Sequence, residues 1–385
     1  MPAYVSSTAE PPWFARPAAR AWTCPPAPTE VRDFHASLSG YAPTPLTELP
    51  PLATELGIGR VFVKDESGRL GLPAFKALGA SWAVHRALAA RAARAARAAR
   101  AARAARGDAT APVTLVSATD GNHGRAVART ARLLGHRARI FVPRGVHPEA
   151  VAAIAAEGAE VSQVTGAYDE AVRQAAEAAV APDALLVQDT AWPGYERIPG
   201  WIVEGYSTLC AEIDEQLAAA GAGTPDLIAI PVGVGSLAHA VVTHYRSRPA
   251  GPPTALLSVE PTAAPCVIES LTRGEPVSVT TGETIMAGLN CGTPSSIAWP
   301  RLRDGLDAAI AIPDAASARA AGDLARLGIS SGPCGAASLA GLRAALTGDG
   351  ADERRAALGL GPASTVVLLS TEGSAANPAA TTADA

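Results

Sequence analysis

The sequence lacks the features that mark membrane, secreted and nucleic-acid-binding proteins. No apolar run approaches the roughly 20 residues that cross a bilayer, and the first residues show no basic stretch followed by an apolar block. The net charge is −4, so the chain has no positive surplus that would attract DNA, RNA or an anionic membrane. We therefore expect a cytoplasmic protein with no nucleic-acid partner and no membrane contact.

Cysteine and aromatic residues are also scarce. The five cysteines (Cys24, Cys210, Cys266, Cys291 and Cys334) are odd in number and show no paired spacing. This pattern argues against a disulfide framework and against a metal site, and it favours reduced, buried thiols. Aromatic residues make up 4% of the chain and hydrophobic residues 48%, with abundant alanine and glycine, which is typical of a soluble α/β enzyme.

An unusual repeat lies between residues 89 and 106, where arginine recurs at every third position from Arg91 to Arg106 among alanines. Alanine and arginine favour a helix. A three-residue step falls about 60° short of one turn, so the arginines spiral and leave no continuous apolar face. We expect a helical insert that extends into solvent and has no catalytic role. An arm for nucleic acid or an acidic partner is the alternative.

Elsewhere, short apolar runs alternate with segments of helical periodicity, which predicts parallel sheets built from βαβ units. The expected strands are 61–63, 113–118, 138–142, 160–164, 184–188, 227–231, 255–259, 309–312 and 365–369. The expected helices after the insert are 121–134, 148–157, 169–179, 199–220, 237–246, 315–327 and 334–346.

The length of 385 residues exceeds that of one ordinary domain, so we expect two lobes. The predicted fold class is α/β, with a mostly parallel sheet flanked by helices in each lobe. Residues 1–85 and 200–385 would form a large domain and residues 86–199 a small one, with the ligand between the lobes at the carboxyl ends of strands. The first 40 or so residues, rich in proline and alanine, would wrap the surface or a partner subunit.

A lysine begins the helix of the first strand-turn-helix unit. The segment from Val61 to Ala80 contains an apolar strand, a polar turn broken by glycine, and then Lys76 before an Ala/Leu-rich stretch. Because Lys76 follows apolar Phe75 and lies at the positive end of a helix dipole, we expect it to lose its proton readily. Such amines form Schiff bases, and pyridoxal phosphate is the common biological aldehyde that needs one. A surface lysine on an amphipathic helix is the alternative.

Two loops after expected strands carry acidic side chains. Thr119 and Asp120 precede an Asn-His-Gly motif that starts at Asn122 and opens a helix, where free backbone N–H groups attract anions. Asp120 opposes anion binding there unless it acts as a base or holds a cation. Asp189 follows the strand at 184–188 and, in a parallel sheet, faces the same cleft. A simple turn and a helix N-cap are the respective alternatives.

A glycine-rich turn follows the expected strand at 227–231. Gly233, Val234, Gly235 and Ser236 lead directly into a helix. Glycine lets the backbone approach a ligand closely and the helix start favours anions, so we expect this turn to hold a phosphate. A lone Gly-x-Gly is weak evidence, and its place at a strand-to-helix turn strengthens it.

These segments resemble the fold-type II pyridoxal phosphate enzymes, and most of all the diaminopropionate ammonia-lyase family. The likeness includes the run from Val187 to Glu196, Val-Gln-Asp-Thr-Ala-Trp-Pro-Gly-Tyr-Glu. The resemblance implies that Lys76 carries pyridoxal 5′-phosphate, that Asn122 contacts its 3′ oxygen, and that the glycine-rich turn holds its phosphate. It also implies that Thr371, or its neighbour Ser370, lies near the pyridine nitrogen.

The resemblance further implies a reaction, the α,β-elimination of 2,3-diaminopropionate to pyruvate and two ammonia. Lys76 would take the Cα proton from one face and Asp120 from the other, which would allow both the L and D isomers. Asp120 and Asp189 suit a β-ammonium leaving group better than a hydroxyl. The expected catalytic residues are therefore Lys76, Asp120 and Asp189, and Thr119 and Tyr195 join the two aspartates in binding the amino acid. A homodimer is the expected assembly.

Two alternatives remain open. A serine or threonine dehydratase, or another β-eliminating or β-replacing enzyme of this fold, would share Lys76 and the glycine-rich turn. Asp120 and Asp189 argue against it. A pyridoxal phosphate-binding protein without turnover is the second alternative, and the presence of all three predicted catalytic residues argues against that.

Overall fold

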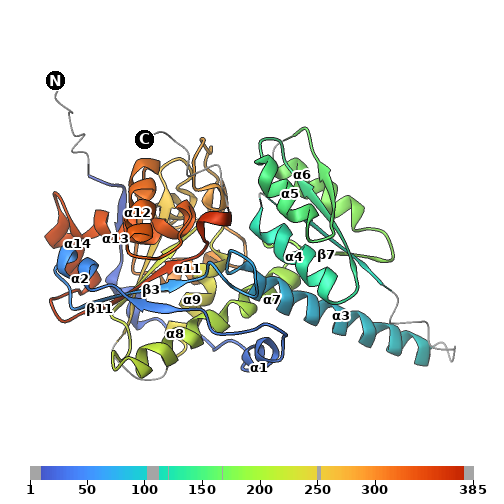
Figure 1. Cartoon of the computed structure of the whole chain (residues 1–385), viewed down its shortest axis with the longest axis horizontal. Coiled ribbons are helices and arrows are strands. Elements are labelled where there is room, and N and C mark those ends of the chain that lie inside the picture. The colour runs from blue at the N-terminus through green and yellow to red at the C-terminus, as the bar shows by residue number, and fades with distance from the viewer. Residues whose placement is uncertain (1–9, 102–111, 120, 167, 249–252, 377–385) are drawn as a thin grey trace.

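Two β-sheets, each covered by helices, make up the protein (Figure 1). The computed structural model describes residues 10–101, 112–119, 121–166, 168–248 and 253–376. Within these ranges the larger sheet has seven strands in the order β1-β10-β9-β8-β11-β3-β2, and the smaller has four in the order β6-β5-β4-β7. The expected α/β fold class, with two mostly parallel sheets, is confirmed.

The larger sheet is parallel at its centre and antiparallel at both edges. Strands β10, β9, β8, β11 and β3 run parallel, while β1 and β2 are antiparallel to their neighbours. Central parallel strands are buried on both faces and therefore read as continuous apolar runs. The strands are β1 (Trp13–Ala15), β2 (Leu46–Glu48), β3 (Arg60–Asp65), β8 (Leu227–Pro231), β9 (Ala255–Pro261), β10 (Ala308–Ile312) and β11 (Thr365–Ser370).

Helices cover this sheet on both faces. Helix α13 is buried along most of its length because it packs on four of the strands, which explains why it is apolar all round. The helices of this lobe are α1 (Glu30–Ala36), α2 (Pro50–Leu56), α8 (Ser207–Ala219), α9 (Ser236–Arg246), α10 (Cys266–Arg273), α11 (Trp299–Gly305), α12 (Asp314–Arg326), α13 (Pro333–Leu346) and α14 (Ala351–Leu358). Short 3-10 segments are η1 (Pro17–Ala21), η2 (Ala287–Leu289) and η3 (Ser374–Ala376).

The smaller sheet is parallel throughout and forms a separate lobe (Figure 1). Its strands are β4 (Thr114–Ala118), β5 (Arg137–Val142), β6 (Glu160–Gln163) and β7 (Ala184–Leu186). Its helices are α4 (Asn122–Leu133), α5 (Pro148–Ala155) and α6 (Tyr168–Ala178). Each element lies within a few residues of its expected bounds.

Two helices connect the lobes, α3 (Lys76–Ala101) and α7 (Arg197–Gly205). They pack closely because glycines face the contact: a Cβ at Gly79 would lie 2.6 Å from the Tyr206 ring, and one at Gly205 would lie 2.6 Å from the Leu78 carbonyl oxygen. The expected domain boundaries, near residues 85 and 200, fall inside these helices and stay a prediction. The single helix expected at 199–220 is wrong, because the chain breaks it at Tyr206 into α7 and α8.

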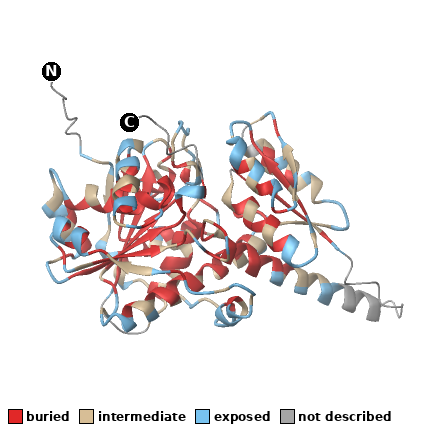
Figure 2. Ribbon diagram, viewed as in Figure 1, coloured by how far each residue is buried: buried red, intermediate tan, exposed pale blue. Residues whose placement is uncertain are grey.

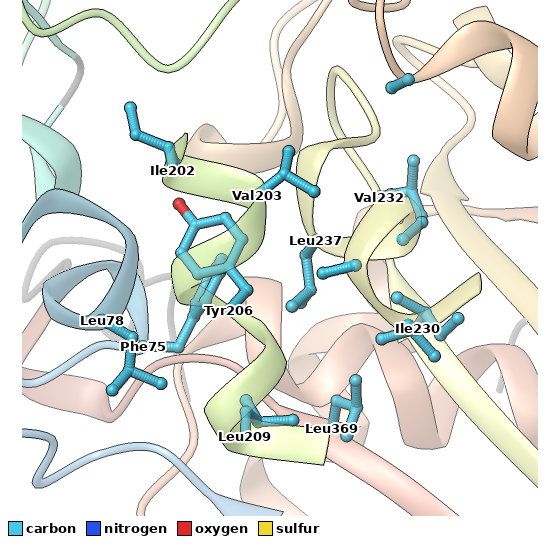
Figure 3. Packing of buried hydrophobic residues seen from close by; sticks show 14 of the residues in the cluster. Phe75, Leu78, Ile202, Val203, Tyr206, Leu209, Ile230, Val232, Leu237 and Leu369 are labelled. Carbon is cyan, nitrogen blue, oxygen red and sulfur yellow. The ribbon is translucent and has the colours of Figure 1, made fainter. Parts of the chain in front are cut away.

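The core between these helices and the large sheet is apolar (Figure 3). Phe75 packs against Tyr206 with ring centroids 4.7 Å apart, and Leu78, Ile202 and Leu209 surround the pair. Figure 2 shows buried residues concentrated in both sheets and in the helix faces that cover them. The start of α3 is thus fixed in a rigid environment, which positions Lys76.

Two segments have an unusual composition, the N-terminal segment rich in proline and alanine and the arginine repeat. Strand β1 pairs with β10 of the same chain, and α1 is tied down by His35, whose Nδ1 lies 2.7 Å from the Thr208 Oγ1 and whose Nε2 lies 3.0 Å from the Leu78 carbonyl oxygen. The described N-terminal residues, from residue 10 onward, therefore pack on their own chain, and contact with a partner subunit stays a prediction. Helix α3 continues into the arginine repeat as far as Ala101, with Arg94 exposed, and residues 102–106 lie outside the described ranges. Across the described helices, none combines the length and apolar character of a membrane span.

Candidate active site

Lys76 and Asp189 meet between the lobes. Lys76 follows β3 and the turn after it, and Asp189 follows β7 of the small sheet. The Lys76 Nζ donates to the Asp189 Oδ2 at 2.6 Å. Their side chains keep 22% and 10% of their exposure, so both can be reached by a small molecule. Residues 113 positions apart in the sequence are thus brought together where strand ends of the two sheets face each other.

The charges of this pair stabilise each other. Burial by itself lowers the pKa of the Lys76 ammonium, but the Asp189 carboxylate more than offsets this, so the pKa is raised above the usual lysine value. Burial raises the pKa of Asp189, while His123 and Lys76 lower it, and it settles at about 2. The expectation of a readily deprotonated lysine is therefore wrong for this arrangement, because a carboxylate in contact outweighs both burial and the helix dipole.

His123 lies behind the pair, in the first turn of α4. Its Nε2 is 2.8 Å from the Val187 carbonyl oxygen, which can only accept, so Nε2 carries the proton. Its Nδ1 is buried without a hydrogen-bond partner and lies 3.9 Å from the Asp189 Oδ2. Burial lowers the pKa of His123, and the carboxylate of Asp189, which raises it, only partly offsets this effect. The ring is therefore neutral at neutral pH. Nδ1 is thus an unused acceptor beside the carboxylate, and it suits a donor group of a ligand.

The glycine-rich turn lies where the sequence predicts it, between β8 and α9. A Cβ at Gly233 would lie 2.9 Å from the Cys291 Sγ, and one at Gly235 would lie 2.5 Å from the Leu302 Cδ1, so a side chain at either position would displace these neighbours. Gly235 also has a φ of +95°, which favours glycine. No side chain caps the first turn of α9, so its N–H groups remain available to an anion.

Ser236 joins this turn to the small lobe. Its hydroxyl donates to the main-chain oxygen of Asp189 at 3.1 Å. The turn that we expect to hold a phosphate is therefore connected directly to the loop that carries Asp189. Val234 belongs to the same turn, and its carbonyl accepts the Ser295 N–H at 2.9 Å.

Asn122 and the segment after β11 also come together. The Asn122 Nδ2 donates to the Glu372 Oε2 at 2.6 Å, and the Cys334 N–H donates to the Glu372 Oε1 at 3.2 Å. The Thr371 carbonyl accepts the Phe75 N–H at 3.2 Å, next to Lys76. Ser370, the alternative to Thr371, is buried, and its hydroxyl donates to the Ser331 Oγ at 2.9 Å. Asn122 of the small lobe is thus joined to the segment of Thr371 and Glu372, which also bonds to Phe75 next to Lys76.

The remaining expected residues have less direct positions. The Thr119 hydroxyl accepts the N–H groups of Gly121 and Gly124 at 2.9 and 3.0 Å, which shapes the start of α4. Asp120 lies outside the described residues. The Tyr195 hydroxyl donates to the Leu186 carbonyl at 3.0 Å and accepts the Gln188 N–H at 2.9 Å. Its hydrogen-bonding capacity is used inside the Asp189 loop, and its role in binding substrate stays a prediction.

This set of residues fits pyridoxal phosphate. Lys76 supplies an amine, the turn from Gly233 to Ser236 supplies backbone N–H groups for an anion at the uncapped start of α9, and Thr371, directly after β11, carries a neutral hydroxyl rather than a carboxylate. Both lobes contribute, so the fit depends on the arrangement of the two sheets.

Sequence reasoning missed three residues of this region, His123, Gln188 and Glu372. His123 was read only as part of an Asn-His-Gly turn. Gln188 is fully buried and bonds across to β4, while Glu372 bonds to both lobes. No local signal marks the last two residues, because their partners are distant in the sequence. Gln188 bonds to Ala118, 70 positions away, and Glu372 bonds to Asn122, 250 positions away.

Comparisons with known proteins agree with this geometry. Residues 38–372 match the family model described as pyridoxal-phosphate dependent enzyme. Diaminopropionate ammonia-lyase from Salmonella typhimurium is 39% identical over 297 residues, which cover 75% of this chain and 73% of that protein. A crystal structure of the Escherichia coli diaminopropionate ammonia lyase, in complex with an aminoacrylate-PLP azomethine reaction intermediate, superimposes with a TM-score of 0.81 at 34% identity, covering 93% of this chain and 92% of the other. The selenomethionine holo form of the Escherichia coli protein gives 0.83 at 32% identity, with 97% of each chain covered.

Proposed function

The chain belongs to the pyridoxal-phosphate dependent enzymes, and within them to the diaminopropionate ammonia-lyases, and we propose that it eliminates ammonia from 2,3-diaminopropionate. The overall reaction consumes one water and yields pyruvate and two ammonia. The observation that carries the proposal is the contact between the Lys76 Nζ and the Asp189 Oδ2 at 2.6 Å. This contact supports the proposal because it brings together the amine that would anchor the cofactor and the carboxylate that would hold a cationic leaving group.

The cofactor would be held at three places. Lys76 would bind its aldehyde carbon, the N–H groups from Gly233 to Ser236 its phosphate, and Asn122 its 3′ oxygen, with Thr371 near the ring nitrogen. When bound, pyridoxal phosphate withdraws electrons from the Cα of an amino acid and so makes the Cα proton acidic. Since Thr371 is neutral, it would not enforce a charged ring nitrogen, and elimination of a good leaving group tolerates that.

The acidic residues would choose the substrate. A β-amino group must leave protonated, and Asp189, with its pKa lowered to about 2 by His123 and Lys76 against the effect of burial, stays charged at neutral pH and attracts an ammonium. The unused Nδ1 of His123 lies 3.9 Å from the same carboxylate and can accept a further ammonium proton. Lys76 on one face and Asp120 on the other would remove the Cα proton.

A stoichiometric assay tests the proposal. Purified protein with pyridoxal phosphate is supplied with L- and D-2,3-diaminopropionate and with L- and D-serine, and pyruvate and ammonia are measured together. We expect two ammonia per pyruvate from diaminopropionate and much slower release from serine. Preferred turnover of serine or threonine, with one ammonia per oxoacid, would instead identify a dehydratase. Cofactor binding without release from any amino acid would identify a protein that has lost turnover.

The site of attachment can be identified without turnover. The chain contains only two lysines, Lys64 and Lys76. Lys64 has no exposed side-chain surface and bonds to Glu212 at 2.7 Å. Reduction of the pyridoxal phosphate complex with borohydride should therefore place a stable adduct on the peptide that contains Lys76. An adduct on Lys64, or none, would contradict the proposal even if pyruvate were formed.

We also propose that the protein works in the cytoplasm as a homodimer. The five cysteines are free, as expected in a reducing compartment. Light scattering of the purified holoenzyme gives the mass in solution, and a monomer that turns over at the full rate would contradict the dimer.

A further inference from the structure

The loop that carries Asp189 leaves the small sheet in an unusual way. Strands β4 and β7 pair in parallel from Thr114 opposite Ala184 to Val116 opposite Leu186. The last regular rung is the Val187 N–H donating to the Val116 carbonyl at 2.7 Å. In a parallel ladder the next rung would join the Ala118 N–H to the Val187 carbonyl. That rung is not made.

The side chain of Gln188 takes its place. The Ala118 N–H donates to the Gln188 Oε1 at 2.9 Å, and the Ser117 hydroxyl donates to the same oxygen at 3.2 Å. The Val187 carbonyl, released from the ladder, accepts from the His123 Nε2 instead. A side-chain amide thus continues the sheet by one rung while the main chain turns away from it.

The other end of the amide reaches the site. The Gln188 Nε2 donates to the Tyr168 hydroxyl at 2.8 Å and lies 3.5 Å from the Asp189 Oδ1. The Gln188 N–H is held by the Tyr195 hydroxyl at 2.9 Å. Gln188 has no exposed surface, so these bonds are made away from water, where an unpaired partner is costly.

We propose that Gln188 is a positioning residue for the elimination, whose amide fixes Asp189 relative to Lys76 and to the loop that begins after Ala118. Ala118 is the last strand residue before Thr119 and Asp120, so one amide group spans the loops of both predicted catalytic carboxylates. Gln188 touches neither substrate nor cofactor in this role. The inference rests on the proposed function for its effect on rate, and on the hydrogen bonds alone for its effect on the loops.

Two substitutions distinguish the role of the Gln188 amide oxygen from that of its amide nitrogen. Gln188→Met keeps the length of the side chain and removes every polar atom. Gln188→Glu keeps an oxygen that can accept from Ala118 but removes the donor to Tyr168 and Asp189. Gln174→Met serves as the matched control, because Gln174 bonds to Glu170 on the outer helix α6.

For Gln188→Met we expect turnover of diaminopropionate to fall by about 10- to 100-fold, since a displacement near 1 Å has effects of this size. The affinity for pyridoxal phosphate should change less than about threefold, since the glycine-rich turn belongs to the other sheet. The acidic limb of the kcat/KM profile should move to higher pH, because a displaced Asp189 lies farther from His123 and Lys76, the groups that lower its pKa against the effect of burial. A loss of folding alone would not shift this limb.

Hydrogen exchange provides a readout that needs no turnover. The amide of Ala118 should exchange faster in Gln188→Met than in the wild type, while Gln188→Glu should retain its protection, and Gln174→Met should match the wild type in exchange and rate. Unchanged turnover or unchanged Ala118 exchange in Gln188→Met would overturn the inference, as would equal deprotection in the Met and Glu variants. If Met fails to fold, the Glu variant decides by its rate, because it keeps the acceptor for Ala118 and lacks the donor to Tyr168 and Asp189, so wild-type turnover in Gln188→Glu would overturn the inference.

Failure of the proposed function gives a different result. A wild-type protein inactive on diaminopropionate would remove the rate prediction and leave the exchange prediction in place. Deprotection of Ala118 without any turnover would then support the placement of the loops while rejecting the reaction.

Discussion

The two lysines of this chain have the same kind of partner and opposite behaviour. Lys64 donates to the Glu212 Oε2 at 2.7 Å and Lys76 donates to the Asp189 Oδ2 at 2.6 Å. Burial, only partly offset by Glu66 and Glu212, lowers the pKa of Lys64. For Lys76 the carboxylate outweighs burial and the pKa is raised. The distance to one carboxylate therefore does not determine how a lysine behaves.

The difference lies in how completely each amine is bound. The Lys64 Nζ donates to the Thr44 carbonyl, to Glu212 and to the Gln216 Oε1, at 2.7, 2.7 and 2.8 Å, which uses all three of its protons. Arg69 bonds to Glu66 and to Glu212 beside it, so the cluster is fully paired inside the protein. Among the described residues, Lys76 donates to Asp189 alone and keeps 22% of its side-chain exposure. A saturated amine stabilises the fold, and an unsaturated one can bind a ligand.

Replacing each lysine in turn should separate the two amines by function. Lys76→Ala should lower turnover by at least about 10⁴-fold and abolish the covalent cofactor band, because no other accessible lysine exists to form the bond. Lys64→Met should keep the band wherever the variant folds. Absorbance spectra and pyruvate release on both variants test this, and a cofactor band that survives in Lys76→Ala would show that Lys76 is not the site of attachment.

The second effect separates them by stability. Lys64→Met leaves the Glu66, Arg69 and Glu212 cluster with an uncompensated negative charge, so unfolding should become easier by about 3–5 kcal/mol. Arg32→Met is the control, since Arg32 and Glu215 are about half exposed and surface pairs contribute only about 0–1 kcal/mol. Urea unfolding monitored by circular dichroism measures both. Equal losses of unfolding free energy in the two variants would mean that the buried Lys64 pair contributes no more to stability than the exposed Arg32 pair.

The third effect concerns the carboxylate. Asp189→Asn keeps the shape but removes the charge that holds a cationic leaving group, and kcat/KM should fall by about 10²- to 10³-fold. Serine, whose leaving group is a hydroxyl, should lose less. Paired assays on the two substrates measure the ratio, and an equal loss on both would mean that Asp189 does not recognise the β-ammonium.

A pH dependence follows from the same pair. Because the pKa of Lys76 is raised, the neutral amine is rare at pH 7 and becomes commoner as the pH rises through the alkaline range. The rate at which the cofactor-free protein binds pyridoxal phosphate should therefore rise with pH. In Asp189→Asn the main group that raises this pKa is gone, so the rise should occur at lower pH. Stopped-flow absorbance compares the two profiles, and coincident curves would contradict the assignment.

Sequence alone predicted what depends on local pattern. Strand β8 has the bounds expected for it, Leu227–Pro231, because a buried parallel strand is a continuous apolar run. Lys76 begins α3 and the turn from Gly233 to Ser236 opens α9, as expected, because helix starts follow from neighbouring residues. The break between α7 and α8 was missed because it depends on how closely α7 packs against α3 at Gly205.

What sequence could not predict depends on contacts between distant segments. The predicted direction of the Lys76 pKa shift was wrong, because the contact with Asp189 forms only where the two sheets face each other. The role of Lys64 could not be predicted, because its partner Glu212 lies 148 positions away in the sequence. The catalytic roles of Lys76, Asp120 and Asp189 stay predictions that rest on chemistry and resemblance.

The smallest expected effect tests how the Asp189 loop is held at Lys76. Ser236→Ala removes the hydroxyl that donates to the Asp189 main-chain oxygen. One hydrogen bond of this kind contributes about 1 kcal/mol, so kcat/KM should fall about fivefold, while cofactor affinity changes little because the backbone N–H groups of the turn remain. Thr272→Ala is the control, since its hydroxyl donates within α10. Measuring kcat/KM and the equilibrium binding of pyridoxal phosphate for both variants separates the effect on rate from the effect on cofactor affinity. A loss of cofactor affinity larger than the loss of rate would mean that the Ser236 hydroxyl serves the phosphate rather than the loop of Asp189.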